Sequence, residues 1–147
     1  MKIFLGTDHN GYDYKQDLVK YLSTTEHQII DVNDVLDPND DFPQFAARAC
    51  NALLQDDPEN SRGLLICGSG QGMVMAANRF KGIRASLCFT AEQARAARND
   101  DNSNVLCLAA NFTETEEAKQ IINVFLLTPF AKAPRFIRRL KELDELN

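Results

Sequence analysis

The sequence predicts a single α/β domain, with a Rossmann-like, three-layer α/β/α fold around a five-stranded parallel sheet and a further C-terminal helix. Two observations lead to this prediction. Short apolar runs alternate five times with longer segments of helical periodicity, which is typical of a parallel sheet covered by helices. The length of 147 residues, of which 44% are hydrophobic, fits one domain with one core over residues 1–147.

The first quarter of the chain is expected to contain two strands and one helix. Lys2–Thr7 is mostly apolar and is predicted to form the first strand. Apolar residues then recur at helical spacing over residues 14–22, ahead of a second predicted strand at 28–32. Residues 34–41 are acidic and contain a proline, so we expect them to form a loop.

The middle of the chain is expected to continue the same alternation. Apolar residues four positions apart over 45–53 predict a second helix. Residues 63–67 (GLLIC) are apolar on both faces, as in a fully buried third strand. A glycine-rich turn then leads to a short helix predicted at 73–80, and a fourth strand is predicted at 83–89.

The last third of the chain is expected to hold one more strand and three helices. Thr90 is predicted to begin a helix rich in alanine and arginine, which leads to a fifth strand at 104–109. Thr113 opens a T-x-x-E capping box, which predicts that a helix with apolar residues at 118–126 begins there. A last helix is predicted from about Arg135.

Composition and charge argue against several classes of protein. The chain has 16 Lys and Arg against 21 Asp and Glu, a net charge of −5, whereas nucleic-acid binders usually carry a basic excess. No apolar run reaches the length of about 18 residues that spans a membrane, and the N-terminus lacks the apolar region of a secretory signal. We therefore expect a cytoplasmic protein that handles a small molecule, without nucleic-acid or membrane partners.

The four cysteines are spread along the chain and form no CxxC pair or Cys/His cluster that would suggest zinc. Cys50, Cys88 and Cys107 lie in apolar segments, and we expect them to be buried free thiols. Cys67 instead begins the glycine-rich turn, where a helix N-terminus favours a thiolate that could act as a nucleophile or a general base. An inert thiol is the alternative for Cys67.

The parallel sheet directs attention to three turns, because ligands bind at the carboxyl ends of the strands near a switch in strand order. We expect these turns at 7–11, 67–72 and 98–103. The 67–72 turn (CGSGQG) can present backbone N–H groups at a helix N-terminus, which makes an anion site. Its G-x-G-x-G spacing matches neither the dinucleotide fingerprint nor the Walker pattern, so a turn without a ligand remains an alternative.

Two further pairs of polar side chains are candidate ligands. Asp8 and His9 follow the first strand, although Asp8 could equally cap a helix and His9 could be a solvated loop residue. Arg135 and Arg139 lie four residues apart, so they share a helix face and could bind one phosphate. A solvated helix face is the alternative for the two arginines.

Six motifs follow one another along nearly the whole chain: GTDHNGYDYK, DFP, LLICGSGQGM, AANRFKGIRA, SNVL and APRFIRRL. Taken together, they resemble the family of ribose-5-phosphate isomerase B and the galactose-6-phosphate isomerase subunits. The resemblance implies an aldose–ketose isomerase of sugar phosphates that needs no metal or organic cofactor and works through a cis-enediolate. It also implies a homodimer, or a tetramer, with sites at the subunit interface.

The resemblance also implies roles for individual residues. Cys67 matches the family's base, which moves a proton between carbons 1 and 2, and Ser69 matches a hydroxyl that relays a proton between the two oxygens. Negative charge develops on oxygen during enolisation, and backbone N–H donors of the turn are suited to stabilise it. The turn residues expected to contact substrate are Gly68, Gly70, Gln71 and Gly72. The other expected substrate ligands are Asp8 and His9, with Arg135 and Arg139 on the phosphate.

The chain departs from the family pattern at several of these positions. Asp100 stands where the family has the histidine that opens the furanose ring, and Asp101 replaces an asparagine that contacts substrate. Asn111 stands where a third phosphate arginine is expected, and Phe42 replaces a tyrosine. We expect Asp100 to act as an acid–base group and Asp101 to contact the substrate.

Three functions remain open at this point. Interconversion of ribose 5-phosphate and ribulose 5-phosphate is the prediction, because it describes the family's largest group. An enzyme for a four-carbon sugar phosphate would not need the histidine, because such a sugar cannot close a furanose ring once its terminal oxygen carries phosphate. The third possibility is a non-catalytic sugar-phosphate-binding relative, or one half of a hetero-oligomer with a paralogous subunit. The presence of Cys67 and Ser69 favours catalysis.

Overall fold

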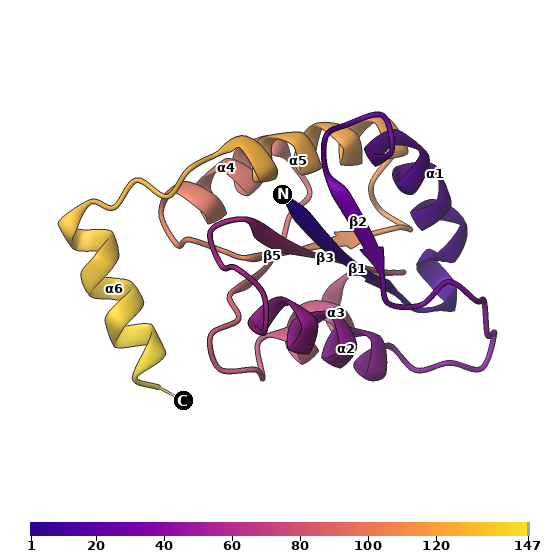
Figure 1. The fold of residues 1–147 in the computed structure, drawn as a ribbon, viewed down its shortest axis with the longest axis horizontal. Coiled ribbons are helices and arrows are strands. Elements are labelled where there is room, and N and C mark those ends of the chain that lie inside the picture. The colour runs from indigo at the N-terminus through magenta and orange to yellow at the C-terminus, as the bar shows by residue number, and fades with distance from the viewer. Residues whose placement is uncertain (147) are drawn as a thin grey trace.

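A computed structural model describes residues 1–146, which form a five-stranded parallel sheet with helices on both faces (Figure 1). The strands are β1 (Lys2–Thr7), β2 (Gln28–Asp31), β3 (Ser61–Cys67), β4 (Ala85–Leu87) and β5 (Val105–Ala109). The helices are α1 (Tyr12–Leu22), α2 (Phe42–Leu54), α3 (Gln71–Ala77), α4 (Ala91–Asn99), α5 (Thr115–Leu127) and α6 (Pro134–Asp144), and a 3₁₀ helix, η1, covers His9–Gly11. The predicted fold class is confirmed.

The strand order is β2-β1-β3-β5-β4, so the chain changes direction across the sheet between β1 and β3. The two strands at this switch lie side by side, with Thr7 paired to Ile66 near their carboxyl ends. Side chains that follow β1 and β3 are thereby brought to one place at the carboxyl edge. This is the position at which open α/β sheets bind ligands.

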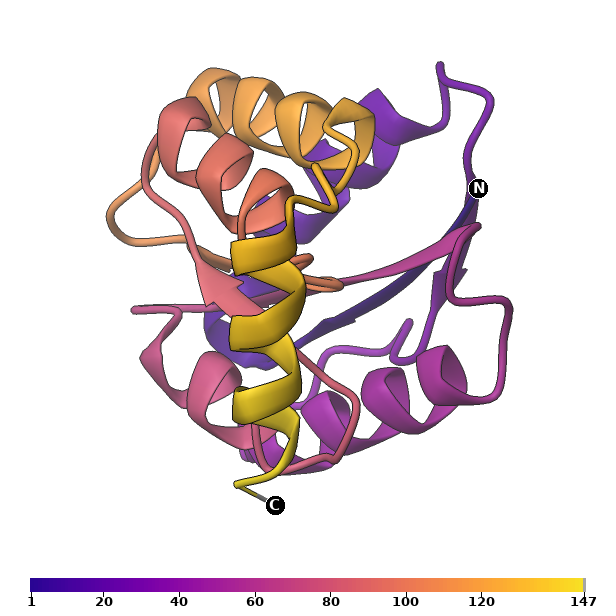
Figure 2. The same cartoon turned by 90° about the vertical axis from the view of Figure 1, so that its left-hand side faces the viewer.

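The helices form two layers, one on each face of the sheet (Figure 2). Helices α1, α4 and α5 pack on one face and α2 and α3 on the other, because each contributes buried residues to a different core cluster. Successive residues of β3 alternate between these clusters, with Leu64 and Ile66 facing one layer and Leu65 and Cys67 facing the other. The sulfur of Cys67 therefore lies on the α2–α3 side of the sheet.

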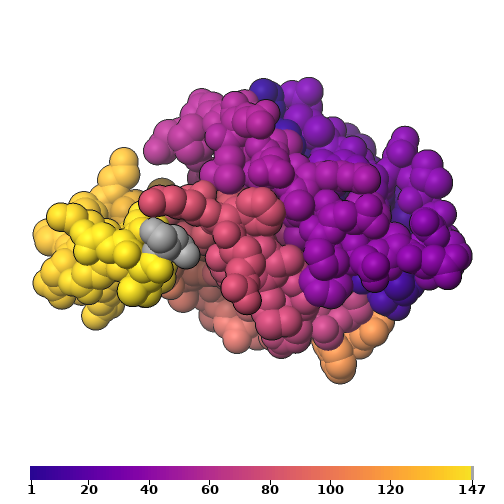
Figure 3. Space-filling model, turned by 90° about the horizontal axis from the view of Figure 1, so that it is seen from below, coloured from indigo at the N-terminus to yellow at the C-terminus, as the bar shows by residue number. Residues whose placement is uncertain are grey.

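Helix α6 belongs to neither layer and forms a lobe at one end of the molecule (Figure 3). The apolar side chains of this helix are only partly buried within the chain. Phe136 is buried, whereas Ile137 is 52% exposed and Leu143 is 45% exposed. The C-terminal end of α6 contacts the rest of the domain through an ion pair of 3.5 Å between Asp144 and Arg84.

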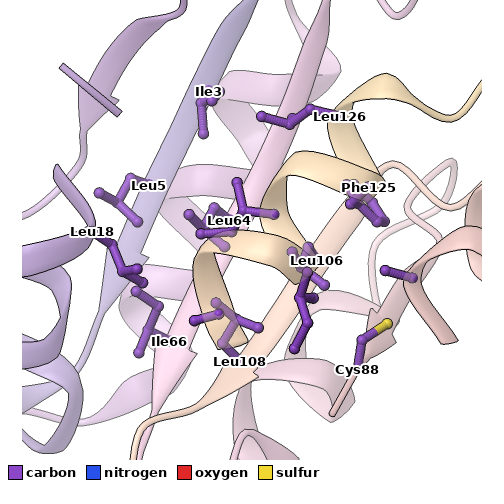
Figure 4. Packing of buried hydrophobic residues seen from close by; sticks show 14 of the residues in the cluster. Ile3, Leu5, Leu18, Leu64, Ile66, Cys88, Leu106, Leu108, Phe125 and Leu126 are labelled. Carbon is purple, nitrogen blue, oxygen red and sulfur yellow. The ribbon is translucent and has the colours of Figure 1, made fainter. Parts of the chain in front are cut away.

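The larger core cluster joins the sheet to α1, α4 and α5 (Figure 4). Leu64, Ile66, Leu106 and Leu108 supply adjacent leucine and isoleucine side chains from the two central strands β3 and β5. All seven residues of β3 are buried, which confirms that its run of apolar residues on both faces marks a central strand. The carboxyl ends of β1, β3 and β5 are therefore held in place by a closely packed core.

Several predicted element boundaries differ from those in the structure. The capping box predicted at Thr113 is wrong, because α5 begins at Thr115 and the hydroxyl of Thr113 is buried without a hydrogen-bond partner among the described residues. A capping box forms instead at the start of α4, between Thr90 and Gln93. Helix α3 begins two residues earlier than predicted, at Gln71.

Candidate active site

The turn between β3 and α3 holds Cys67 at the carboxyl edge of the sheet. Gly70 has a φ of +74°, and this left-handed conformation turns its backbone N–H towards Cys67 Sγ, 3.1 Å away. Cys67 is buried at 4% exposure, while Ser69 is exposed and accepts a hydrogen bond of 3.3 Å from the Gln71 backbone N–H. A thiol and a hydroxyl thus stand two residues apart on the same tight turn.

The turn is closely surrounded, which explains its glycines. A Cβ on Gly70 would lie 2.4 Å from Leu87 Cδ1, and one on Gly68 would lie 2.9 Å from Asn111 Nδ2 and 3.4 Å from Asn10 Cβ. Asn10 follows β1 and Asn111 follows β5, so the neighbouring loops of both strands meet the backbone at Gly68. A side chain at Gly68 or Gly70 would therefore displace the surroundings of Cys67.

The expected structural role of Asp8 is present in the structure. Its side chain is buried and accepts hydrogen bonds from the backbone N–H groups of Asn10, at 3.1 Å, and Gly11, at 3.3 Å. Asp8 is therefore the N-cap of η1. Its position at the carboxyl end of β1, beside β3, also keeps it within the candidate site.

His9 is fixed by a residue that the sequence did not single out. Asp40, in the loop before α2, accepts a hydrogen bond of 2.9 Å from the backbone N–H of His9 and lies 2.8 Å from His9 Nδ1. The Asp40 side chain is only 3% exposed. Its hydrogen bond and its negative charge raise the pKa of His9. No sequence signal separates Asp40 from the other aspartates of this acidic loop.

The other three cysteines are buried thiols that are not activated for chemistry. Cys50, Cys88 and Cys107 are free and buried, as predicted. Burial raises the pKa of the Cys50 thiol to about 12 and that of Cys88 to about 11, and raises the pKa of Cys107 well above its ordinary value. Neutral thiols at these three positions pack as small apolar groups.

A second group of predicted site residues lies around the α4–β5 turn and α6. Asp100 ends α4 and accepts a hydrogen bond of 2.7 Å from Asn99 Nδ2. Asp101 is exposed, and its pKa is raised by partial burial and by the neighbouring Asp100, against the opposing influence of Arg139. Arg135 stacks on the ring of Phe136 at 4.5 Å. Asp101 and Arg139 are thus near enough to interact, while Asp100 and Arg135 lie on the same two segments of the chain.

Arg98 ties this second group together. Its guanidinium is buried and donates to the backbone carbonyl of Ser103 at 2.5 Å and to that of Thr128 at 3.3 Å, which join the α4–β5 turn to the segment leading to α6. A backbone hydrogen bond of 3.1 Å from Ala131 to the carbonyl of Asn99 reinforces the connection. Arg98 therefore helps to set the spacing between the carboxylates and the arginines.

The two groups lie at opposite edges of the sheet. The prediction that residues 98–103 lie at the carboxyl edge is wrong, because a turn that leads from a helix into a parallel strand lies at that strand's amino end. β5 pairs with β3 from Val105 opposite Gly63 to Ala109 opposite Cys67, and these four steps span about 13 Å. Within one chain, Cys67 and the α4–β5 turn are separated by at least that length.

Residues 1–146 contain neither a candidate metal centre nor a candidate membrane span. No group of three or more His, Cys, Asp or Glu side chains within that range is arranged to hold a metal ion. No helix within the same range is long and apolar enough to cross a membrane.

Comparison with known proteins gives a consistent set of relatives. The family model described as Ribose/Galactose Isomerase matches residues 3–143. Ribose-5-phosphate isomerase B of Mycolicibacterium paratuberculosis is 35% identical over 146 residues, covering 99% of this chain and 91% of the relative. The solved structure of ribose-5-phosphate isomerase B from Clostridium thermocellum matches with a TM-score of 0.93 and 31% identity, covering 99% of this chain and 97% of that one. That of Mycoplasma genitalium, with bound ribulose-5-phosphate, has a TM-score of 0.92 and 34% identity, covering 99% and 95%.

Proposed function

The chain belongs to the Ribose/Galactose Isomerase family, and from this we propose that it is an aldose–ketose isomerase acting on a sugar phosphate of the ribose 5-phosphate type. The observation that carries the proposal is the Cys67 turn. A thiol with a backbone N–H on its sulfur stands beside an exposed hydroxyl, at the strand-order switch where the fold binds ligands. The ribulose-5-phosphate bound to the Mycoplasma genitalium relative supports a five-carbon substrate.

In the proposed mechanism, Cys67 is the base of an enolisation. The thiolate removes the proton from carbon 2 of the open-chain aldose, and the electron pair of that bond moves to form the enediolate. Ser69 relays a proton between the oxygens on carbons 1 and 2, and Cys67 returns its proton to carbon 1. Backbone N–H groups of Gly68 and Gly72 stabilise the charge on oxygen, each such donor being worth about 2.7–4 kcal/mol in comparable sites. Those of Gly70 and Gln71 hold the Cys67 sulfur and the Ser69 hydroxyl instead.

The proposed site is shared between two copies of the chain. The separation of about 13 Å between the two groups prevents one chain from bringing both to a single substrate. A partner would present Arg135 and Arg139 to the phosphate of a sugar held at Cys67 of the first chain, with Asp100 and Asp101 nearby. The exposed apolar side chains of α6 support this arrangement, because a helix that packs on a partner would bury them. We propose a homodimer as the minimal active unit, and the free thiols fit a reducing cytoplasm.

A four-carbon sugar phosphate is a second candidate substrate. The observation that favours it is the carboxylate of Asp100 where the family's ring-opening imidazole stands. An open-chain substrate has no ring to open, so the proton transfer at Cys67 and the phosphate contacts would suffice.

Deuterium incorporation tests the proposed reaction. In deuterated water, the wild-type protein is expected to introduce deuterium at carbon 1 or 2 of a four- or five-carbon sugar phosphate. NMR measures the rate at which the label enters each carbon. Cys67→Ala is expected to lower the exchange rate by at least about 100-fold, the usual contribution of a general base, with little change in binding of the phosphate. The matched control is Cys88→Ala, which removes a buried thiol from another strand end and is expected to exchange normally.

The outcomes of this experiment separate two errors. A Cys67→Ala protein that exchanges as fast as wild type contradicts the assignment of the base. A folded wild-type protein that labels none of the sugars contradicts the isomerase proposal as a whole.

A further inference from the structure

A polar cavity of about 240 Å³ lies between α1 and the segment that leads from β5 into α5. The segment passes beside α1 (Figure 1), and the cavity is lined by Tyr14 and by residues 110–115. This volume is below the roughly 300–1,000 Å³ of pockets for drug-sized ligands, so it suits a molecule of about the size of a pentose. None of the lining residues belongs to the 67–72 turn or to α6, so the cavity is separate from both groups of proposed site residues.

Two hydroxyl groups of the lining residues have no hydrogen-bond partner among residues 1–146. Thr113 is 4% exposed, and its Oγ1 atom is buried and unpaired. Tyr14 is partly buried, and its phenolic oxygen is likewise buried and unpaired. Buried hydroxyls are normally hydrogen-bonded, because a hydroxyl without a partner loses the bond that it would make to water. Two such groups on one cavity indicate a ligand that pairs with both.

The first turn of α5 adds further donors to the cavity. The N-cap residue Glu114 makes no side-chain hydrogen bond to this turn. The backbone N–H groups at the start of a helix have no partner within the helix, and here the N-cap side chain does not supply one. Thr115, the first residue of α5, lines the cavity. Oxygen atoms of a ligand can therefore accept hydrogen bonds from the helix as well as from the two hydroxyls.

The charges around the cavity favour a neutral ligand. Glu114, Glu116 and Glu117 lie at the start of α5, where their carboxylates repel phosphate and other anions. Burial and the negative charges of Glu114 and Glu117 raise the pKa of Tyr14, so its hydroxyl stays protonated and able to donate. A metal cation lacks ligands, because no group of three or more His, Cys, Asp or Glu side chains in the described range is arranged to hold one.

Hydroxyl groups have the chemistry that these partners require. A hydroxyl accepts a hydrogen bond from Tyr14 or Thr113 and donates one to a carboxylate such as that of Glu114. Phe112 is 70% exposed and lines the same cavity, so its ring offers an apolar face to the C–H groups of a ligand. Alternating C–H and O–H groups are the surface of a sugar or a sugar alcohol.

We propose that this cavity binds a neutral polyhydroxyl molecule, with the hydroxyls of Tyr14 and Thr113 as hydrogen-bonding partners and the ring of Phe112 as a packing surface. The inference is independent of the proposed function, because the ligand needs neither a phosphate nor contact with Cys67.

The test is a titration of the full-length protein with ribitol, a five-carbon polyol without a carbonyl or a phosphate. NMR follows the Thr113 methyl and the Phe112 ring, and the expected Kd is on the order of 10 mM, as is usual for a ligand this small. Tyr14→Phe and Thr113→Val are each expected to weaken binding about 3- to 10-fold, the loss of one neutral hydrogen bond. Tyr21→Phe is the matched control, because it removes a hydroxyl from the same helix at a residue that does not line the cavity.

Thermal unfolding separates a lost ligand contact from a damaged fold. Because the two hydroxyls are unpaired within the chain, neither Tyr14→Phe nor Thr113→Val is expected to lower the Tm of the free protein. Ribitol is expected to raise the Tm of wild type, and to raise that of the two variants less at the same concentration.

Four results would overturn the proposal. The first is no change in the Thr113 and Phe112 signals up to about 100 mM ribitol, well above the expected Kd. The second is equal binding by wild type, Tyr14→Phe and Thr113→Val. The third is a lower Tm of either variant without ligand, which would mean that the hydroxyl is paired within the chain. The fourth is inorganic phosphate producing the same shifts at lower concentration. Ribitol cannot be isomerised, so each of these results leaves the isomerase proposal standing.

Discussion

Mixing two inactive variants is expected to restore activity that neither has alone. One variant is Cys67→Ala, which removes the proposed base, and the other is the double change Arg135→Ala and Arg139→Ala, which removes the proposed phosphate ligands. Because the two groups lie at opposite edges of the sheet, about 13 Å or more apart, each proposed site takes one group from each of two chains. A mixed dimer therefore contains one site in which both groups are intact.

The magnitude follows from the symmetry of a dimer. Random pairing of equal amounts of the two variants gives mixed dimers in about half of the molecules. Each mixed dimer has one intact site and one site that lacks both the cysteine and the two arginines. The mixture is expected to recover about one quarter of the wild-type activity at the same chain concentration.

The assay requires controlled exchange of subunits. The two variants carry different affinity tags, are unfolded together in denaturant, refolded, and purified through both tags in sequence. The purified mixed dimers are expected to show about half of the wild-type rate per dimer. The control is each variant refolded alone, which is expected to remain inactive.

Two outcomes would refute the reasoning. Mixed dimers that form but show no activity mean that the two groups never meet across an interface. Activity in the Arg135→Ala and Arg139→Ala protein alone means that the arginines are a solvated helix face, the alternative that the sequence left open.

Two further predictions concern the scaffold of the site, and both are checked by thermal and denaturant unfolding. Gly70→Ala is expected to lower stability by at least about 1–2 kcal/mol, because the new Cβ meets Leu87 at 2.4 Å and the backbone keeps a φ of +74°; a fully stable variant would contradict the tight turn. Arg98→Met is expected to cost about 2–3 kcal/mol, because the buried carbonyl of Ser103 loses its donor. The exposed Arg95→Met on the same helix is the control and is expected to change stability little; equal effects of the two would contradict the role of Arg98.

The fold was largely predictable, because its main signals are local. Residues 63–67 are apolar on both faces, and only a central strand needs that pattern. The T-x-x-E pattern at Thr113 gave a wrong boundary, because the threonine side chain turns into the core instead of capping the helix. The equivalent pattern at Thr90, which the sequence also contains, forms the actual capping box.

The site was predictable only in part. The Cys67 turn follows from its place after a buried strand. The prediction that residues 98–103 lie at the carboxyl edge of the sheet is wrong. The order of the elements already excluded it, because these residues lead from α4 into β5 and so lie at the amino end of that strand. The contact between Asp40 and His9 joins residues 31 positions apart in sequence, and no pattern within an acidic loop indicates which aspartate will be buried.

The proposed sharing of each site between two chains has a consequence for how such a gene evolves. After a duplication, one copy is free to lose the cysteine turn while the other loses the arginine helix, and co-assembly still leaves one complete site per pair. Each copy then becomes essential to the other without any gain of new chemistry. Selection would afterwards favour mixed pairing over self-pairing, so that a homomeric enzyme becomes an obligate partnership through losses alone.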